Sequence, residues 1–582
     1  MLGKQSLNAL PLIVIIVCCA CVVAQTRTPA PNAVTPARSE EPTTGSISGS
    51  VVNEGGQPLA GVRVTIREFN PGGSGRIAST DPEGKFHVDG LGPGLYFVSA
   101  FSPAYVTQPT DAAWPFNHYR IGDSVRIEMV RGGVITGTVT NANGEPVIGV
   151  GVRAIMIRNA KGETPGALNV AYLEKTTDDR GIYRLFGLPG GTYLVSAGGA
   201  TNSQRFLLNR YDSDLPTFAP SSNRDTAAEI TLRAGEELNA DIRYRGETGH
   251  IISGTMKIIG SSNGSLSLSA AGSPIPLANA FQMPGTRGFE FSGIADGEYD
   301  VIATEIKSPP PPPGQQPEFM TSEPKRVVVK GADVTGLELI PRSLASITGR
   351  IVLEASKVAA CEGKRRPEFV EMLLTLQRPD RDSTEKENLP FWRSLPSAVS
   401  PDANGGFALR NLPPGRYLFD PRFYARYWYL RSISIAATPK TDPAANWTAL
   451  RFGDQISNFT ITLAEGAASI RGRLKSVEKT EIPSGFGIYL VPAETEMKAD
   501  VLRYFMTPLQ EDGTFALNSL PPGRYLTLVQ QLDAQTNTLA KLRLPESAET
   551  RAKLRRTAES QKTNLELKPC QNLTDFQLSI KQ

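Results

Sequence analysis

Short stretches in which apolar residues alternate with polar or small ones run through the chain from residue 45 to its end. Val62–Ile66 is typical, because every second residue is aliphatic, and Ile47–Val51 alternates apolar with small residues. A period of two places alternate side chains on opposite faces of a β-strand. Segments rich in Gly and Asn, such as 53–58, separate the stretches and supply the positive φ angles of tight turns. The pattern predicts an all-β protein.

One stretch occurs five times and defines a repeat. In its first copy Phe86 is followed ten residues later by Tyr96, with Leu91 five residues before that tyrosine. Self-similarity at a regular spacing indicates a tandem array. We interpret the repeated glycine as turning a corner and the repeated tyrosine as holding that corner on the core. The glycine–tyrosine pairs are Gly94 and Tyr96, Gly191 and Tyr193, Gly297 and Tyr299, Gly415 and Tyr417, and Gly523 and Tyr525.

Each repeat is predicted to be a complete β-sandwich. It opens with an alternating strand that has glycine at its centre, and it closes with another alternating strand shortly before the next opener. The copies lie roughly one hundred residues apart, which suits a sandwich of about seven short strands. We therefore expect five antiparallel sandwiches, which cover residues 45–131, 132–246, 247–342, 343–465 and 466–582.

Three segments interrupt the repeats. Pro309–Pro313 is expected to form a polyproline II loop tip in the third repeat. Residues 546–560 are rich in Glu, Ala, Lys and Arg, and Glu549 lies four residues before Lys553, which predicts one short helix in the fifth repeat. An aromatic run, Phe423–Tyr429, interrupts the fourth repeat.

The first repeat contains three motifs that resemble the carboxypeptidase regulatory-like domain. They are G-x-P-L-x-G-V at Gly56–Val62, T-D-x-x-G-x-F at Thr80–Phe86 and L-x-x-G-x-Y at Leu91–Tyr96. The second repeat has the central signature again at Thr177–Tyr183, repeats four and five match in part, and repeat three keeps only the Gly-Tyr corner. The resemblance implies transthyretin-like (prealbumin-like) sandwiches, related to Cna-type B repeats and to starch-binding-like folds, in a secreted bacterial-type protein. It says little about function, because such modules are accessory units attached to many activities.

Residues 1–24 have the pattern of a secretory signal peptide. Lys4 begins it, an apolar run follows, and small residues lead up to Ala24. Cleavage after Ala24 is favoured over an uncleaved anchor, because the apolar run is short for a bilayer, and over a lipoprotein anchor at Cys21. Residues 25–44 are rich in Pro and Thr and predict a disordered tether. The mature protein is expected in the periplasm, at the cell surface or in the medium, with no transmembrane segment.

Two cysteines remain after the signal peptide, Cys361 and Cys570. An even count in an exported protein permits a disulfide. The two residues lie in different repeats, so a bridge would tie two modules together. Two buried free thiols are the alternative.

Charge and histidine content argue against several classes of function. The 61 basic and 58 acidic residues are nearly balanced and form no block of like charge, which argues against a nucleic-acid partner or a polybasic membrane patch. The three histidines, His87, His118 and His250, are scattered, and a zinc peptidase or a Ser-His-Asp site would need them in a cluster. Acidic turns such as 81–84 suit hairpins better than calcium sites. We expect no enzyme activity, no metal and no cofactor.

The aromatic run of the fourth repeat is the best candidate for a ligand platform. Flat rings stack on sugar faces, and arginine donates hydrogen bonds to hydroxyl groups. On a strand, however, alternate side chains would enter the core or meet a neighbouring module, and packing is the favoured interpretation. The candidate residues are Tyr424, Arg426, Tyr427, Trp428 and Tyr429.

The sequence therefore predicts a non-catalytic, secreted, multi-domain structural or interaction protein. Its partner would be a protein or a polysaccharide at the cell surface. A carbohydrate-binding protein of starch-binding-like fold is one alternative. An accessory protein to a neighbouring outer-membrane or secreted enzyme system is another.

Overall fold

The structure is a computed structural model, and the residues it describes all lie within one unit, Thr44–Gln582. The predicted signal peptide, residues 25–43 of the tether and Pro309–Pro313 lie outside the described residues. Within the unit the description omits residues 71–72, 74, 108–117, 164–171, 200–209, 258–263, 274–275, 282–287, 308–315, 378–397, 436–446, 477–484, 511, 533–546, 562 and 581–582.

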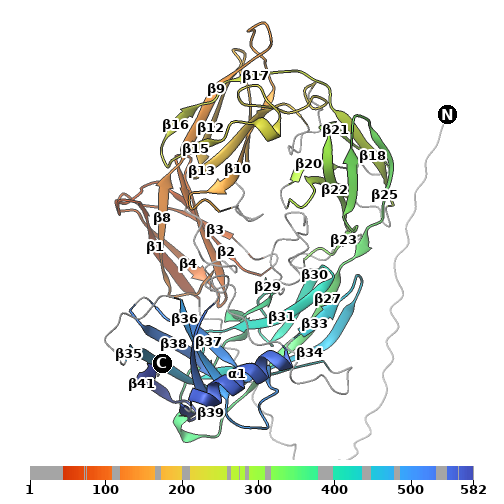
Figure 1. Cartoon of the computed structure of the whole chain (residues 1–582). Helices are drawn as coiled ribbons and strands as arrows, with labels where there is room; N and C mark the ends of the chain where they lie inside the picture. Colours follow the sequence, from red (N-terminus) through yellow and green to blue (C-terminus); the bar gives the residue numbers. More distant parts are fainter. Residues whose placement is uncertain are drawn as a thin grey trace, which may run out of the picture. The chain divides into compact units, whose positions relative to one another are not determined.

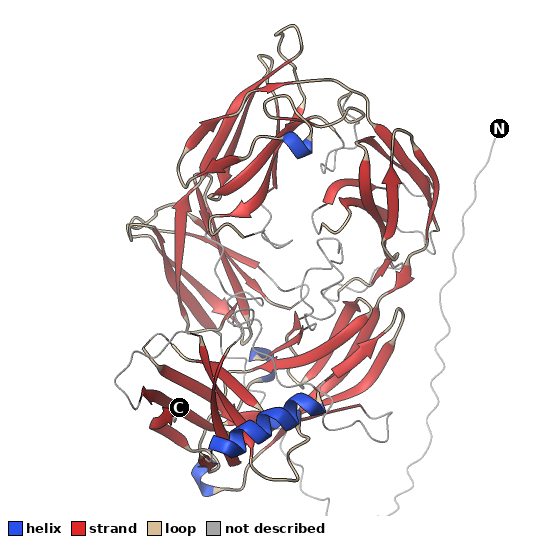
Figure 2. Ribbon diagram, in the orientation of Figure 1, coloured by secondary structure: helices blue, strands red, loops and turns tan. Residues whose placement is uncertain are grey.

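The first module shows the plan on which the chain is built. One sheet has the strand order β4-β1-β8-β6 and the other has the order β3-β2-β5-β7. Figure 1 shows the strands in chain order, and Figure 2 shows how completely strands dominate. The elements are β1 (Gly45–Asn53), β2 (Arg63–Glu68), β3 (Gly75–Ser79), β4 (Lys85–Leu91), β5 (Tyr96–Phe101), β6 (Tyr105–Thr107), β7 (His118–Tyr119) and β8 (Ser124–Arg131).

Modules 2 and 3 repeat this plan with local changes. In module 2 the closing strand is split into two pieces, and in module 3 a short extra strand joins the second sheet. Module 2 contains β9 (Gly133–Thr140), β10 (Gly151–Asn159), β11 (Tyr172–Thr176), β12 (Ile182–Leu188), β13 (Gly191–Ala197), β14 (Thr217–Phe218), the 3₁₀ helix η1 (Arg224–Thr226), β15 (Ile230–Leu232), β16 (Glu237–Asn239) and β17 (Ile242–Arg243). Module 3 contains β18 (His250–Met256), β19 (Gly264–Ala270), β20 (Pro276–Phe281), β21 (Gly288–Ile294), β22 (Gly297–Ile306), β23 (Phe319–Thr321), β24 (Lys325–Val329) and β25 (Val334–Leu339), and β26 (Arg342–Ser343) pairs with β23.

Modules 4 and 5 follow the same order. Module 4 contains β27 (Ala345–Glu354), η2 (Ala359–Cys361), η3 (Phe369–Glu371), β28 (Leu373–Gln377), β29 (Ala398–Val399), β30 (Gly406–Leu412), β31 (Gly415–Arg422), β32 (Trp428–Ile435), β33 (Trp447–Leu450) and β34 (Gln455–Glu465). Module 5 contains β35 (Ala468–Ser476), β36 (Phe486–Pro492), η6 (Val501–Arg503), β37 (Phe505–Pro508), β38 (Thr514–Leu520), β39 (Gly523–Gln531), α1 (Ala548–Gln561), β40 (Asn564–Leu567) and β41 (Asn572–Ile580). The helix α1 confirms the predicted helix of the fifth repeat.

The predicted antiparallel pairing holds throughout the described sheets except where the first strand of a module meets its last. β1 is antiparallel to β4 and parallel to β8. The same arrangement returns for β9, β18, β27 and β35. The opening strand therefore lies inside its sheet, between the strand that carries the repeated aromatic residue and the closing strand.

Every module has a core of its own between its two sheets. In module 1, Ile47, Phe86 and Tyr96 are buried together, and the equivalent residues Ile135, Tyr183 and Tyr193 are buried in module 2. Three further cores lie in modules 3, 4 and 5. Full burial of one large aliphatic or aromatic side chain contributes about 1.5–3 kcal/mol, so each module has the means to fold around its own centre.

The five repeated tyrosines make the same hydrogen bond. Each side-chain hydroxyl donates to the carbonyl oxygen four residues earlier, at the corner where the chain passes from one sheet to the other. Burial raises the pKa of Tyr96, Tyr193 and Tyr299, and raises that of Tyr525 to about 12, so the hydroxyls are neutral donors. The pairs are Tyr96 with Gly92 (2.8 Å), Tyr193 with Pro189 (2.7 Å), Tyr299 with Ala295 (2.8 Å), Tyr417 with Pro413 (2.7 Å) and Tyr525 with Pro521 (2.8 Å).

Each corner begins with a residue in the left-handed backbone conformation, just before the buried aliphatic residue. Ser519 has φ 55°, an unfavourable conformation for a residue with a Cβ atom, and it is followed by Leu520. The pairing register between the opening strand and its antiparallel neighbour shifts at this end in every module. The five residues are Gly90, Gly187, Gly293, Asn411 and Ser519.

The glycine at the centre of each opening strand has no room for a side chain. A Cβ atom on Gly49 would lie well inside 3.0 Å of both the Val125 carbonyl oxygen and the Phe86 ring. In the other modules too, a Cβ atom on the glycine at the centre of the opening strand would overlap a backbone carbonyl oxygen of the closing segment. Each opener glycine also pairs across the ladder with the repeated aromatic residue, as Gly49 does with Phe86 and Gly472 does with Phe515. The glycine therefore makes the space that the ring and the closing strand occupy.

We expect Gly49→Ala to destabilise module 1 by about 1–3 kcal/mol, because the added methyl overlaps backbone that cannot retreat. Gly92→Ala is the matched control, since no atom lies within 4 Å of a Cβ atom at that position. Hydrogen exchange of residues 45–131 in increasing urea measures both effects. Equal stability of the two variants would contradict the steric explanation.

Candidate functional site

Trp428 lies in the core of module 4 and not on its surface. It begins β32, which pairs antiparallel with β34, and only 1% of its side-chain surface is exposed. The ring packs with Phe419 and Phe459 in the same hydrophobic cluster. Trp428 is therefore unavailable for stacking on a sugar ring. The expectation that Trp428 belongs to a ligand platform is therefore wrong, whereas Tyr424 and Arg426 are exposed and Tyr427 and Tyr429 are half-buried. Binding of a ligand by these four residues stays a prediction.

Tyr424 contacts the first module. The guanidinium carbon of Arg120 lies 4.0 Å from the centre of the Tyr424 ring, and the Tyr424 hydroxyl donates a hydrogen bond to the His118 carbonyl oxygen at 3.3 Å. Arg120 also donates to Glu371 of module 4 at 3.2 Å. A cation over an aromatic ring contributes about 0.5–1 kcal/mol at an exposed site. The Tyr424 ring, a candidate for ligand binding in the sequence analysis, is thus in contact with residues of module 1.

Arg426 and Tyr427 contact the start of module 5. The Arg426 guanidinium donates to the Ser469 hydroxyl at 3.2 Å and to the Asn572 side-chain carbonyl. The backbone carbonyl oxygen of Tyr427 accepts from the amides of Gly466 and Ala467, at 2.8 and 2.9 Å, in the segment that connects the two modules. These bonds fix the connection between modules 4 and 5.

Tyr429 completes the contact with module 5. Its side chain is half-buried, and burial raises its pKa while the guanidinium of Arg503 acts in the opposite direction. Arg503 in turn donates to the Pro522 carbonyl oxygen at 2.7 Å and to the hydroxyl of the corner tyrosine Tyr525 at 3.2 Å. The aromatic run therefore reaches the corner of the next module.

A disulfide joins the same two modules. Cys361 ends η2 in module 4, and Cys570 lies in the turn before β41 in module 5. The amide of Cys570 also donates to the carbonyl oxygen of Gly466 at 3.0 Å. We call this set of contacts the module 4–5 joint. Its residues are Cys361, Arg426, Tyr427, Gly466, Ala467, Ser469, Cys570 and Asn572.

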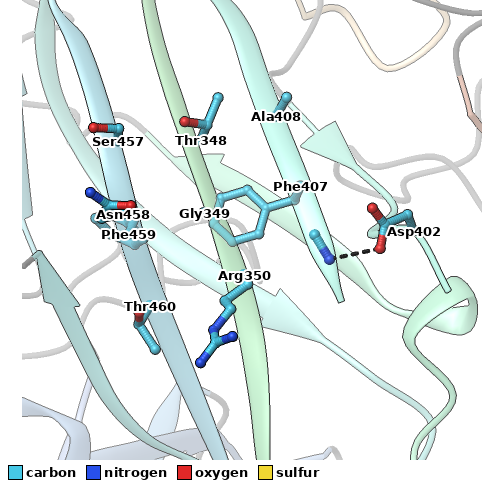
Figure 3. Close-up of a pocket in the computed structure, with 11 residues that line it drawn as sticks. Thr348, Gly349, Arg350, Asp402, Phe407, Ala408, Ser457, Asn458, Phe459 and Thr460 are labelled. Atoms are coloured by element: carbon cyan, nitrogen blue, oxygen red, sulfur yellow. Dashed lines mark hydrogen bonds between the residues drawn. The ribbon is translucent and has the colours of Figure 1, made fainter. Parts of the chain in front are cut away.

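A groove with mixed polar and apolar lining runs along the β30-β27-β34 sheet in module 4 (Figure 3). Thr348 and Arg350 line it, together with Asn458, whose φ of 60° marks a bulge in the closing strand. Asp402 borders the groove and accepts a hydrogen bond from the Gly406 amide at 2.8 Å. The equivalent groove of module 5 includes Arg471, Arg473, Asp575 and Gln577. Both grooves surround an opener glycine, so they are a consequence of the repeated strand geometry.

The acidic turns use their carboxylates to stabilise the backbone. Asp178 accepts hydrogen bonds from the amides of Ile182 (2.8 Å) and Arg180 (2.9 Å), and the bond from Ile182 contributes most to lowering its pKa. Asp81 accepts from the amide of Lys85 in the same manner. The described residues contain no group of three or more His, Cys, Asp or Glu side chains arranged to hold a metal ion.

The histidines occupy separate places in the described part of the chain. His87 lies on β4 with its Nε2 2.7 Å from Asp89, and both side chains are exposed. His250 begins β18 and lies 3.3 Å from Asp296 and 3.8 Å from Asp333. Within the described ranges, no helix has the length and apolar character needed to cross a membrane.

Residues 46–113 match the family model of the carboxypeptidase regulatory-like domain, so the resemblance noted for the first repeat is confirmed. No curated protein sequence matches the chain. Among solved structures, the Bacillus anthracis TIE protein is similar at 15% identity over 52% of this chain and 50% of that chain, with a TM-score of 0.14. The matched region thus spans about half of the TIE protein.

Two other solved structures are similar to parts of this chain. A minor pilin of Streptococcus agalactiae matches at 13% identity over 35% of this chain and 96% of that chain, with a TM-score of 0.19. Two B repeat units of the collagen-binding protein Cna of Staphylococcus aureus match at 11% identity over 69% and 93%, with a TM-score of 0.18. The assignment of the fold rests on the strand topology described above.

We expect Arg426→Ala to loosen the module 4–5 joint, because a hydrogen bond from a charged group contributes about 1.5–3 kcal/mol. The measurement uses protein whose disulfide has been reduced. There the amides of residues 466–470 and 570–573 should exchange at least about tenfold faster in Arg426→Ala than in the wild type. Arg422→Ala is the matched control, since Arg422 pairs with Asp420 inside module 4 at 3.2 Å. An equal change in both variants would show that the contact to module 5 contributes nothing.

Proposed function

We propose that the protein is an exported, non-catalytic structural protein that carries tension through a chain of β-sandwich modules. One observation carries the proposal. In each of the five modules the first strand and the last strand are parallel neighbours. The pairs are β1 with β8, β9 with β16 and β17, β18 with β25, β27 with β34, and β35 with β41.

This pairing sets the direction in which a pull acts. The chain enters a module at the start of its first strand and leaves at the end of its last. In a parallel pair those two points lie at opposite ends of the ladder, so tension slides one strand along the other. The inter-strand hydrogen bonds are then loaded together, whereas an antiparallel hairpin pulled at its open end would lose them one at a time. Parallel terminal strands therefore favour resistance to force.

The length of the ladders supports the proposal. In module 1 the parallel register runs without a shift from Ser48 opposite Ser124 to Asn53 opposite Met129. The registers of modules 4 and 5 are longer, from Ser346 to Glu354 along β27 and from Ser469 to Ser476 along β35, and each has one shift near the opener glycine. Each ladder lies beside that glycine, where the closing strand approaches most closely. An unbroken ladder packed against a core, as in module 1, is difficult to shear.

The disulfide changes the path of the force. Tension that enters β27 reaches Cys361 and passes through the sulfur–sulfur bond to Cys570 and β41. The 209 positions that separate the two cysteines are then outside the loaded path. This covalent link protects the interior of modules 4 and 5 from extension. Because β34 and β35 lie between the two cysteines, the parallel ladders that bear load in the oxidised chain are those of modules 1 to 3, and reduction brings the ladders of modules 4 and 5 into the loaded path.

Export and the lack of catalysis rest on separate observations. Residues 1–24 have the pattern of a signal peptide, and structural disulfides persist in oxidising compartments outside the cytosol. Among the described residues the histidines are dispersed and the acidic turns are occupied by backbone hydrogen bonds. The partner at the cell surface would be a protein or a polysaccharide to which the array presents its modules.

Single-molecule force spectroscopy of the full chain tests the proposal. We expect discrete unfolding peaks in the oxidised protein, and a reductant should lengthen the fully extended chain by roughly 700 Å, at about 3.3–3.6 Å for each residue released. Cys361→Ser should behave without reductant as the wild type behaves with it. Smooth extension without force peaks would contradict a load-bearing role.

A further inference from the structure

Module 1 has an apolar sheet face that the described structure leaves open. On the β3-β2-β5 sheet, 66% of Ile77 and 62% of Phe101 are exposed. Ile77 lies opposite Thr65, and Phe101 lies opposite Arg63. Residues directly opposite each other share a face of the sheet. We define the outer face of module 1 by Arg63, Thr65, Arg67, Ile77, Phe97 and Phe101.

The equivalent sheet face is less exposed in other modules. The residue three positions after the corner tyrosine lies at the centre of this face, so its burial can be compared between modules. Ser99 is exposed in module 1, whereas its equivalents Ser196, Ile302 and Leu528 are buried in modules 2, 3 and 5. Contiguous exposed apolar surface commonly marks an interaction site when polar residues surround it. Ile77 and Phe101 lie on the two strands that flank β2, with Thr65 and Arg63 between them.

Module 5 shows what such a face receives. Helix α1 lies across β36 and β39 of the second sheet. Ala558 and Leu554 of the helix pack with Val491 and Leu528 of the strands. Arg555 of the helix donates to the backbone carbonyl oxygens at the end of β36, of which that of Ala493 lies at 2.8 Å. In module 5, therefore, an amphipathic helix of the same chain covers the equivalent sheet face.

The charges in module 5 are complementary. Asp500 precedes η6, and its half-buried carboxyl has a pKa that burial raises, while the amide of Leu502, Arg503 and the buried helix residue Arg551 act in the opposite direction. Lys553 and Arg556 of the helix are exposed, so the helix is basic on its outer side as well. Complementary charge favours the correct partner and disfavours like-charged ones.

The outer face of module 1 is basic, whereas the charged residue discussed above for module 5 is the acidic Asp500. Arg63 and Arg67 are both exposed, and no Asp or Glu lies among the β2, β3 and β5 residues that share this face. Two copies packed face to face would bring arginines together, which disfavours self-association through this surface. In the described part of the chain the single α-helix is basic and already packed on module 5. The occupant should therefore be acidic and come from another protein.

We propose that the outer face of module 1 binds an acidic amphipathic helix of a partner protein, in the way that α1 covers the equivalent face of module 5. Ile77, Phe97 and Phe101 would contact the apolar stripe of that helix, and Arg63 and Arg67 would pair with its flanking carboxylates. This inference adds a binding partner to the structural role proposed above. It does not depend on the resistance of the modules to force.

Two synthetic peptides of equal length test the proposal. Both carry the same helical leucine stripe, and the flanking positions are glutamate in one and lysine in the other. Fluorescence anisotropy with the full oxidised chain should show saturable binding of the glutamate peptide and none of the lysine peptide. Ile77→Ser combined with Phe101→Ser should weaken that binding by at least about tenfold. The exposure of both side chains allows this variant to fold.

Charge reversal and a distant control complete the test. Arg63→Glu combined with Arg67→Glu should transfer the preference to the lysine peptide. Val328→Ser removes an exposed apolar side chain of module 3 and should leave binding unchanged. The proposal is overturned if neither peptide binds, if both bind alike, or if the module 1 variants bind normally. A monomer–dimer equilibrium that Ile77→Ser and Phe101→Ser abolish would instead assign the face to self-association.

Discussion

The hydrogen bond from the corner tyrosine to the carbonyl four residues before it is the interaction on which every module depends. It closes the short connection that takes the chain from one sheet to the other, from β4 to β5 in module 1. The ring is buried while the hydroxyl still reaches a backbone acceptor, so the corner is anchored to the core without leaving a polar group unsatisfied. Because the bond joins residues so near in sequence, each module carries its own copy.

The opener glycine is the second constraint, and it is coupled to the first. Phe86 lies against Gly49 and is ten residues from Tyr96, so one short segment determines both the packing of the opening strand and the position of the corner. The closing strand can approach the opener only because glycine has no Cβ atom. The parallel ladder that we propose to bear load is therefore a product of the same glycine.

Local repetition allowed much of the fold to be predicted from the sequence. The corner, the alternating strands, the single helix and the sandwich class all depend on residues that lie close together in the chain. The left-handed residue at each corner was missed because glycine, asparagine and serine all occupy the position, as in Gly90, Asn411 and Ser519. The parallel pairing of first and last strands was also missed, since alternation of side chains shows that a strand exists but not its neighbour's direction.

The candidate site could be predicted only in part, because its contacts join residues far apart in sequence. The aromatic run is prominent in the sequence, and packing, either in the core or against a neighbouring module, is the interpretation that its residues favour. Its partners, Arg120 for Tyr424 and Ser469 for Arg426, carry no sequence signal that marks them as neighbours. Trp428 is a candidate for ligand binding from the sequence but is buried in the structure. An isolated motif cannot show which side chains of a strand face the core.

Hydrogen exchange measured by mass spectrometry on Tyr193→Phe tests the central claim, that each corner bond stabilises its own module. The variant keeps the ring and removes only the hydroxyl that donates to Pro189. The account predicts a loss of about 1 kcal/mol, or roughly fivefold faster exchange, across the described residues between 133 and 243, with the other modules unchanged. Unchanged exchange in module 2, or equal loosening of all five modules, would contradict it.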